Sequence, residues 1–569
     1  MTKGGRIVKL RRFLLPVAIC LILAMTCGIV TAQQKVKWEP YGPQVDQIIM
    51  PIIKDSEAQL IAFNRGDVDV LPGLTRPADI NKIKANPNAE LTMNYGFHMF
   101  YLCYNMRRGP LDADVLRQAI AHVIDRDNII QTLFEGYMLP MATFVPPSSG
   151  FYKEDIPRFP YNPEEAKKLL DKAGYTVDPA TGIRIDPATG KPLRKMTIFT
   201  PTYEVAPTSA ELGKIIAEAC QAINLPIEPE PMDFPVMLDK LDMAEFDMYM
   251  LAWGLSRIPT SLHSFFHSSN DVEAGYNRPG IRDAELDKVL EALYYAPSEE
   301  VAKKAADEAQ VILARRQPYT VLYSRPYMDA FRKDKFTGYV PMHGYGAANY
   351  QNKWTTLNVK PVRGKGGTIR WLLPEEPKVL NPCTSSSAYE WEVLGRLYDN
   401  LMEVNPETME DMPWMAKSWE VGTWEPEPGK KGTVVTWHLE KGIKWQDTTP
   451  FTSKDIKFTI EYLRDNKVPR YLSSVNEVVK VETPDEYTAK VYFSTESYWH
   501  LYHADLSFLP EWIWKDVKDY KTFEPWLESH PTVPGLTKAI GQGPFILDQY
   551  KVGEYVRLKK NPIYWRLSK

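Results

Sequence analysis

The stretch VVTWHLEKGIKW at residues 434–445, followed by PFTSKDIKFT at residues 450–459, carries the two signals that decide the fold. The first stretch begins with a strand-like run of β-branched and aromatic residues, Val434–Leu439. The second is a turn into a helix, with Thr452 as the N-cap and Asp455 at the third helical position. A strand followed by a capped helix predicts a mixed α/β fold.

Helix and strand signals alternate in the same way along most of the chain. Asn162-Pro163-Glu164-Glu165 starts a helix, because Asn162 caps it, proline suits the first turn and Glu165 can reach back to the cap. Gly174 ends this helix. Helical stripes or strand-like runs also occur at Val115–Ile124, Leu286–Leu293, Met196–Phe199 and Ala489–Phe493.

Length and composition indicate a globular protein with two or three cores. The chain has 569 residues, of which 44% are hydrophobic and 25% charged. The formal net charge is −4 and no basic patch stands out, which argues against nucleic acid as a partner.

The N-terminus has the order of a secretory signal. Lysines and arginines within residues 3–12 precede an apolar run, Phe13–Val30, and the small residues Thr31 and Ala32 follow it. A retained membrane anchor is the alternative, but Pro16 and the small residues favour cleavage. We therefore predict a signal peptide at residues 1–32 and a periplasmic or cell-surface protein.

The sequence lacks motifs of metal or catalytic chemistry. The spacing of Cys103, Cys220 and Cys383 predicts buried apolar residues, with a single disulfide as the alternative. The pairs His263/His267 and His500/His503 lack the further ligands of a zinc site. No nucleophile–base arrangement follows from spacing, so we predict no enzyme, no metal and no cofactor.

Two segments place aromatic residues beside small hydroxyl residues, residues 249–266 and 383–398. Flat apolar walls with a few orienting hydrogen bonds suit a polar organic ligand. Core packing beside a surface loop is the alternative. The candidate ligand-binding residues in these segments are Tyr249, Trp253, Ser385, Ser387, Tyr389 and Trp391.

The stretch at residues 434–445 and 450–459 also resembles a signature of the family 5 extracellular solute-binding proteins. This family includes the oligopeptide, dipeptide and nickel binders of ABC importers. Further segments resemble motifs of the same family and together cover nearly all of the predicted mature chain. They are DSEAQ at 55–59, RGDVD at 65–69, RQAI at 117–120, PWMAKSW at 413–419, GQGPF at 541–545 and NPIYW at 561–565.

The order of these motifs differs from the family's order. In the family, the segment that resembles residues 561–565 precedes the one that resembles residues 65–69, whereas here it closes the chain. We interpret the sequence as a circular permutation, with two truncated tandem copies or a gene-model artefact as alternatives. Residues 556–558 should then lie in the same lobe as residues 48–53.

The resemblance implies a two-lobed α/β fold of the type II periplasmic-binding-protein kind with an extra subdomain. Ligand binds between the lobes, and closure about a hinge traps it. The expected order is lobe I at 33–95, lobe II at 96–315, lobe I at 316–359, a linker at 360–368, lobe I at 369–400, the extra subdomain at 401–534 and lobe I at 535–569.

The loop at residues 253–260 bears on the ligand's charge. Ser256 aligns with an aspartate that, in peptide binders, pairs with the ligand's α-ammonium, and Arg257 is the only charged residue of the stretch. The resemblance thus adds both residues to the candidate site and disfavours free-amine peptides. Alternatively, Arg257 faces solvent or pairs with a carboxylate such as Asp247. A nickel complex is disfavoured because Thr260 stands where the nickel binders have a histidine.

The resemblance implies a monomeric, extracytoplasmic solute-binding component of an ABC importer. It would capture oligopeptides or similar small polymers in the interlobe cleft and deliver them to the permease subunits. An oligosaccharide-binding member of the family, a secreted hydrolase and a receptor that has lost transport are the alternatives.

Overall fold

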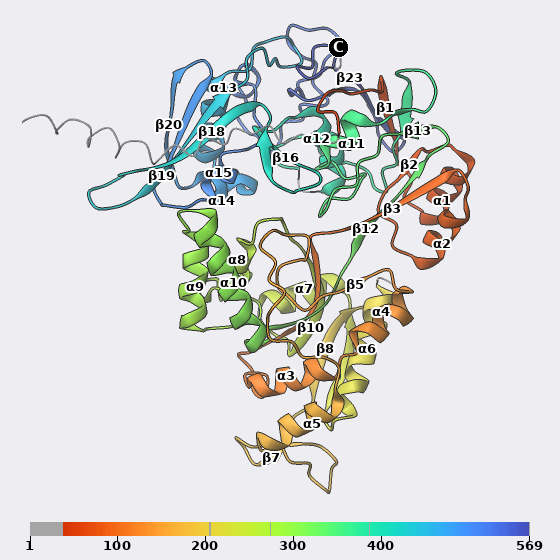
Figure 1. Cartoon of the computed structure of the whole chain (residues 1–569), viewed down its shortest axis with the longest axis vertical. Helices are drawn as coiled ribbons and strands as arrows, with labels where there is room; N and C mark the ends of the chain where they lie inside the picture. Colours follow the sequence, from red (N-terminus) through yellow and green to blue (C-terminus); the bar gives the residue numbers. More distant parts are fainter. Residues whose placement is uncertain (1–37, 204–205, 274, 386, 568–569) are drawn as a thin grey trace, which may run out of the picture. The chain divides into compact units, whose positions relative to one another are not determined.

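The computed structural model describes residues 38–203, 206–273, 275–385 and 387–567, and strands and helices alternate through them (Figure 1). The predicted mixed α/β class is confirmed. The signal predicted at residues 1–32 lies outside the described residues. Among the described residues, no helix has the length and apolar character needed to cross a bilayer.

A six-stranded sheet in the order β5-β11-β4-β10-β8-β9 forms the centre of lobe II, here residues 98–324. Successive side chains of β4 point to opposite faces, so Tyr101 and Cys103 join one core while Leu102 and Tyr104 join the other. Helices α7–α10 cover the first face and α3–α6 the second. The bounds are β4 His98–Tyr104, β5 Leu139–Pro140, β8 Met196–Pro201, β9 Ile227–Met232, β10 Met248–Gly254, β11 Tyr319–Ser324, α3 Asp114–Val123, α4 Arg126–Phe134, α5 Pro163–Lys172, α6 Pro207–Gln221, α7 Phe234–Asp242, α8 Ser261–Phe266, α9 Ala284–Tyr294 and α10 Glu299–Arg316, with the hairpin β6 Ile185–Asp186 and β7 Lys191–Pro192.

Lobe I, residues 38–95, 326–400 and 535–567, contains a sheet that joins segments from both ends of the chain. β1 pairs in parallel with β15 and antiparallel with β23, with Ile48 opposite Leu558 and Met50 opposite Val556. Figure 1 shows β1 and β23, from opposite ends of the chain, close together. The expected proximity of residues 48–53 and 556–558 is confirmed, whereas the permutation itself stays a prediction. The bounds are β1 Gln47–Pro51, β15 Thr368–Arg370, β22 Phe545–Lys551, β23 Tyr555–Lys560, α11 Lys353–Asn358 and α12 Ala388–Leu397.

A second sheet of lobe I, in the order β2-β12-β3, continues into lobe II through two crossings. The chain passes from β3 to β4 at Gly96–Phe97 and returns from β11 to β12 at Arg325. The return therefore lies beyond the boundary expected at residue 316. Ser324 Oγ donates a hydrogen bond to Gly96 O at 3.2 Å and ties the crossings together. The bounds are α1 Ser56–Arg65, β2 Val70–Leu71, α2 Pro77–Ala85, β3 Ala89–Tyr95 and β12 Pro326–Arg332.

The segment predicted as a linker, residues 360–368, is paired at both ends. Lys360 and Pro361 form β14, which pairs with β13 at Phe336–Thr337, and Thr368 begins β15. The residues between them are mainly exposed.

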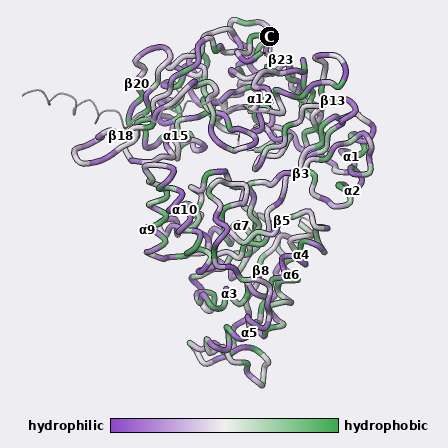
Figure 2. The backbone as a smooth tube through the Cα atoms, viewed as in Figure 1, coloured by the Kyte–Doolittle hydropathy of each residue, from purple (hydrophilic) through white to green (hydrophobic). Residues whose placement is uncertain are grey.

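The segment expected to form the extra subdomain, residues 401–534, contains the sheet β18-β19-β21-β20 and is called the subdomain below. The stretch at residues 434–459 folds as predicted: β19 covers Val434–Leu439, and Thr452 and Asp455 complete a capping box at the start of α13. The tip of the β18–β19 hairpin, EPEPGKK at 425–431, is hydrophilic (Figure 2). The bounds are β16 Met402–Val404, β17 Asp411–Pro413, β18 Ala416–Trp424, β19 Gly432–Leu439, α13 Ser453–Asp465, α14 Leu472–Val475, β20 Val478–Asp485, β21 Thr488–Phe493, α15 His500–His503 and α16 Glu511–Trp514.

Candidate ligand-binding site

The candidate residues of β10 differ in exposure. Tyr249 is fully buried and packs against Tyr101 and Phe246, with ring centroids 6.0 Å and 5.0 Å away, so the structure gives it a packing role. Trp253 is only half-buried. It stacks on Phe265 with ring centroids 4.5 Å apart and lies 5.9 Å, edge to face, from Tyr276.

Trp253, Phe265 and Tyr276 together form an aromatic shelf, and the ring of Tyr276 is exposed. Trp253 Nε1 donates a long, weak hydrogen bond of 3.5 Å to the Tyr319 hydroxyl. An exposed, oriented aromatic face is the kind of surface on which a flat or apolar part of a solute can stack.

Ser256 is exposed on the loop after β10, and its hydroxyl forms hydrogen bonds within the same loop. Its hydroxyl donates to Ile258 O at 3.0 Å and accepts from Ile258 N at 3.2 Å, so it closes a tight turn. A hydroxyl in this position carries no charge for a ligand's ammonium group.

Arg257 pairs with a carboxylate from another part of the fold. Its guanidinium forms an ion pair with Asp411 of β17 and lies 5.0 Å over the ring of Tyr502. Burial alone would lower the pKa of Arg257, but Asp411, together with Tyr502 and Tyr345, outweighs this effect and raises it. Asp247, named above as a partner, instead binds Arg194 at 2.8 Å.

This ion pair matches the alternative in which Arg257 pairs with a carboxylate, although the partner is Asp411, so the loop carries no uncompensated positive charge. The side chains of Arg257 and Asp411 are only 17% and 14% exposed, so each neutralises the other in a poorly solvated position. The part of the argument against free-amine ligands that depended on an unpaired Arg257 therefore fails.

The serine hydroxyls of the second candidate segment form hydrogen bonds with the protein's own backbone. Ser385 is buried and donates to Val379 O at 2.8 Å. Ser387 is the N-cap of α12 and forms a capping box with Glu390. Both contacts are structural, because each satisfies backbone groups of the turn or helix end.

Trp391 is buried beneath a cation in the same region. Arg470 lies 4.3 Å over its ring, and Tyr350 is 6.2 Å away. Its Nε1 donates to Ser385 O at 3.2 Å. Tyr389, two residues earlier, is half-buried.

Tyr345 lies close enough to Arg257 of the first candidate segment for the two side chains to interact electrostatically. Burial raises its pKa to about 12, Arg257 opposes the rise and Tyr350 adds to it, so Tyr345 lies within range of both groups. Sequence spacing gave no sign of Tyr345, Asp411, Arg470 or Tyr502, because their positions depend on contacts between distant segments.

The comparison with known families identifies the chain. The bacterial extracellular solute-binding proteins, family 5 (middle), match it over residues 33–273 and 411–569, more than half of its length. The chain belongs to this family.

Curated relatives of this family 5 protein are similar over about half of their own length. The dipeptide-binding protein of Escherichia coli K12 is 23% identical over 299 residues, 52% of this chain and 53% of the relative. The oligopeptide-binding protein AppA of Bacillus subtilis is 23% identical over 288 residues, 49% of this chain and 51% of the relative. The solved structure of AppA with a nonapeptide aligns with a TM-score of 0.44 at 22% identity, covering 50% of this chain and 56% of that one.

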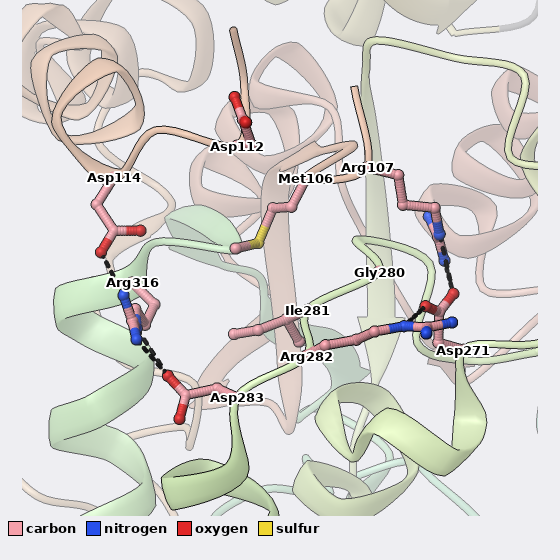
Figure 3. A pocket seen from close by; sticks show the side chains of 10 residues that line it. All are labelled: Met106, Arg107, Asp112, Asp114, Asp271, Gly280, Ile281, Arg282, Asp283 and Arg316. Atoms are coloured by element: carbon pink, nitrogen blue, oxygen red, sulfur yellow. Dashed lines mark hydrogen bonds and ion pairs between the residues drawn. The ribbon is translucent and has the colours of Figure 1, made fainter. Parts of the chain in front are cut away.

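Lobe II of the family 5 protein also has a charged cavity of ≈ 410 Å³ that contains none of the candidate residues. Its arginines are already paired: Arg316 binds Asp114 at 2.8 Å and Asp283 at 2.6 Å, and Arg107 and Arg282 converge on Asp271 (Figure 3). The lining residues are Met106, Arg107, Asp112, Asp114, Asp271, Gly280, Ile281, Arg282, Asp283 and Arg316.

The cysteines and histidines have structural surroundings. Cys103, Cys220 and Cys383 are free and buried, which confirms the packing interpretation over a disulfide. The rings of His263 and His267 stack at 4.5 Å, and burial, with the neighbouring His267, lowers the pKa of His263 to about 4. Within the residues that the structure describes, no three His, Cys, Asp or Glu side chains are grouped as metal ligands would be.

Proposed function

We propose that the protein captures a peptide or a similar small polymer between its lobes outside the cytoplasmic membrane and delivers it to the permease of an ABC importer. Family membership supports this proposal, as do the names of relatives that bind dipeptides and oligopeptides. The observation that carries it is the contact between lobe II and the subdomain at the loop after β10, where Arg257 of lobe II pairs with Asp411 of the subdomain. Binding, permease contact and a monomeric state are all parts of the proposal.

We further propose that the ligand is uncharged at the group that faces this loop. Ser256 offers no carboxylate, and Asp411 is already paired with Arg257, so a buried ammonium would lack a partner. Amine-blocked peptides and neutral oligosaccharides should therefore bind better than free-amine dipeptides.

Mass spectrometry of solutes that copurify with the protein, followed by calorimetry, tests these proposals. The dipeptide Ala-Ala and its N-acetylated form provide a matched pair. Weaker binding of the free amine is expected. Tighter binding of the free amine would show that a carboxylate accepts the ammonium and would refute the charge argument while supporting solute binding.

Trp253→Ala tests the aromatic shelf. We expect affinity for a copurified solute to fall by about 1–3 kcal/mol, because a large stacked contact is removed. Leu251→Ala on the same strand serves as a control for loss of a packed side chain. Unchanged affinity in folded Trp253→Ala would exclude the shelf from the site.

A secreted hydrolase is the alternative from another class. Incubating the protein with peptides and oligosaccharides and searching for products by mass spectrometry distinguishes the two, since a binding protein returns its solute unchanged.

A further inference from the structure

The subdomain inserts a tryptophan into the core of lobe II. Trp499 is 0% exposed and belongs to the same buried cluster as Leu290, Leu293 and Phe151 of lobe II. Its ring centroid lies 5.5 Å from that of Phe151. Large buried aromatic side chains dominate the energetics of such contacts, so this contact is the apolar part of the junction.

The segment around Trp499 also supplies hydrogen-bond donors to the end of helix α9. The last carbonyl groups of a helix have no partner within it. Here Trp499 Nε1 donates to Leu293 O at 2.7 Å, Ser497 Oγ to Tyr294 O at 2.7 Å and Tyr498 N to Ala296 O at 2.6 Å. The subdomain therefore satisfies carbonyls that belong to lobe II.

A polar contact lies beside this apolar one. Tyr502, three residues after Trp499, donates its hydroxyl proton to Asp411 Oδ2 at 2.7 Å. The same aspartate pairs with Arg257 of lobe II, whose guanidinium lies over the Tyr502 ring. The segment around Trp499 is anchored to the subdomain's own sheet, because Ser497 N donates a hydrogen bond to Thr433 Oγ1 of β19 at 2.8 Å.

We propose that residues 497–502, together with Asp411, form a clasp that holds the subdomain against lobe II when the lobes are closed and releases it when they open. Trp499 provides the apolar contact of the clasp, and the Arg257–Asp411 ion pair provides a polar contact that sets how often it opens. The strength of the clasp then biases the balance between open and closed forms, and so the apparent affinity for solute. Its role in solute capture rests on the proposed function, but its existence does not.

The amide of Tyr498 is a built-in reporter, because its hydrogen bond crosses the junction. Hydrogen exchange resolved to single amides measures how often this bond opens without any solute present. In Arg257→Gln we expect the Tyr498 amide to exchange about 5–30-fold faster than in the wild type. Amides within the β19–β21 ladder should keep their rates.

Arg278→Gln is the matched control, since Arg278 pairs with Asp242 at 2.7 Å entirely within lobe II. It should leave the Tyr498 amide unchanged. Trp499→Ala should abolish protection of this amide. If that variant does not fold, two milder variants test the same point. Ser497→Ala removes the hydrogen bond to Tyr294 O that crosses the junction, and Tyr502→Phe removes the one donated to Asp411. Each should raise the exchange rate of the Tyr498 amide.

Two results would overturn the proposal. One is equal exchange of the Tyr498 amide in Arg257→Gln and Arg278→Gln. The other is exchange of that amide at the same rate as the β19–β21 amides in every variant, which would mean that the junction opens only on global unfolding. Solute affinity is measured separately, so absence of binding with a normal clasp would count against the proposed function alone.

Discussion

At the scale of single residues, burial raises the pKa values of two carboxyl groups of the subdomain, Glu403 and Asp505. Burial raises the pKa of Glu403 to about 7, with Lys353 opposing the rise and Asp399 and Asp505 adding to it. Burial also raises the pKa of Asp505 to about 7, although it accepts hydrogen bonds from the Leu401 and Met402 amides.

These raised pKa values predict that stability falls as pH rises. Between the unfolded pKa, about 4, and the folded pKa, about 7, the folded protein binds more protons than the unfolded chain. The free energy of unfolding should therefore decrease through this window, by about 1–3 kcal/mol for Glu403. Urea denaturation at pH 5 and pH 8 measures the decrease.

Glu403→Gln should reduce this dependence, because the amide cannot ionise, while Asp505 keeps its own contribution. Glu308→Gln, at an exposed position of α10, is the control and should keep the wild-type slope. A Glu403→Gln protein as sensitive to pH as the wild type would show that Glu403 is ionised in the folded protein.

Gly344 lies where the chain is both left-handed and crowded. Its φ is +78°, and a Cβ atom there would lie 1.9 Å from a ring carbon of Phe97, at the first crossing. Gly553 has a similar φ of +74° but nothing within 4 Å of a Cβ. Both substitutions to alanine carry the left-handed backbone penalty of about 1 kcal/mol.

Gly344→Ala should lose about 1–3 kcal/mol more of the free energy of unfolding than Gly553→Ala, because the ring of Phe97 must move. Chemical denaturation of both variants gives the difference. Equal losses would mean that the Phe97 ring moves aside freely.

At the scale of elements, Ser387 shows how a hydroxyl that suggested ligand binding serves a helix instead. Its side chain caps α12, and the Glu390 side chain accepts a hydrogen bond from the Ser387 backbone amide. Ser387→Ala should reduce the free energy of unfolding by about 0.5–2 kcal/mol. Ser387→Asp should retain most of it, since aspartate caps equally well. Denaturation that showed no loss in the alanine variant would leave the hydroxyl free for a ligand role.

At the scale of the whole molecule, the two ends of the described chain lie side by side. Gly42 N donates to Arg566 O at 2.9 Å, and β1 pairs with β23. Residues 362–365 are exposed in a turn between β14 and β15. These are the surroundings in which a chain can be cut and rejoined.

A variant that begins at Arg363, ends at Val362 and joins residues 569 and 33 through a short Gly/Ser linker should therefore fold. Its free energy of unfolding should lie within about 1 kcal/mol of the parent's, because closure entropy varies slowly with loop length. Denaturation and circular dichroism check this. Opening the chain between Ile48 and Ile49 instead, inside β1, should prevent folding; an equally stable protein from both cuts would contradict the argument.

Local patterns in the sequence determined the elements. The caps at Asn162 and Thr452 act within three or four residues, and the alternation of Tyr101, Leu102, Cys103 and Tyr104 assigns each side chain to one face of a strand. Such interactions join neighbours, so spacing alone predicts them. The family motifs likewise led to the fold class and to family 5.

Only the tertiary structure decided which distant groups meet. Arg257 and Asp411 are 154 residues apart in the chain, yet they neutralise each other, and this pairing removed the part of the argument about ligand charge that depended on an unpaired Arg257. Trp499 lies in a core whose other members lie far from it in sequence. Tyr249 and Trp253 are both aromatic residues of β10, but one is enclosed and the other half-open. Burial and ion pairing depend on what packs against a residue, and no local pattern of residue types records that.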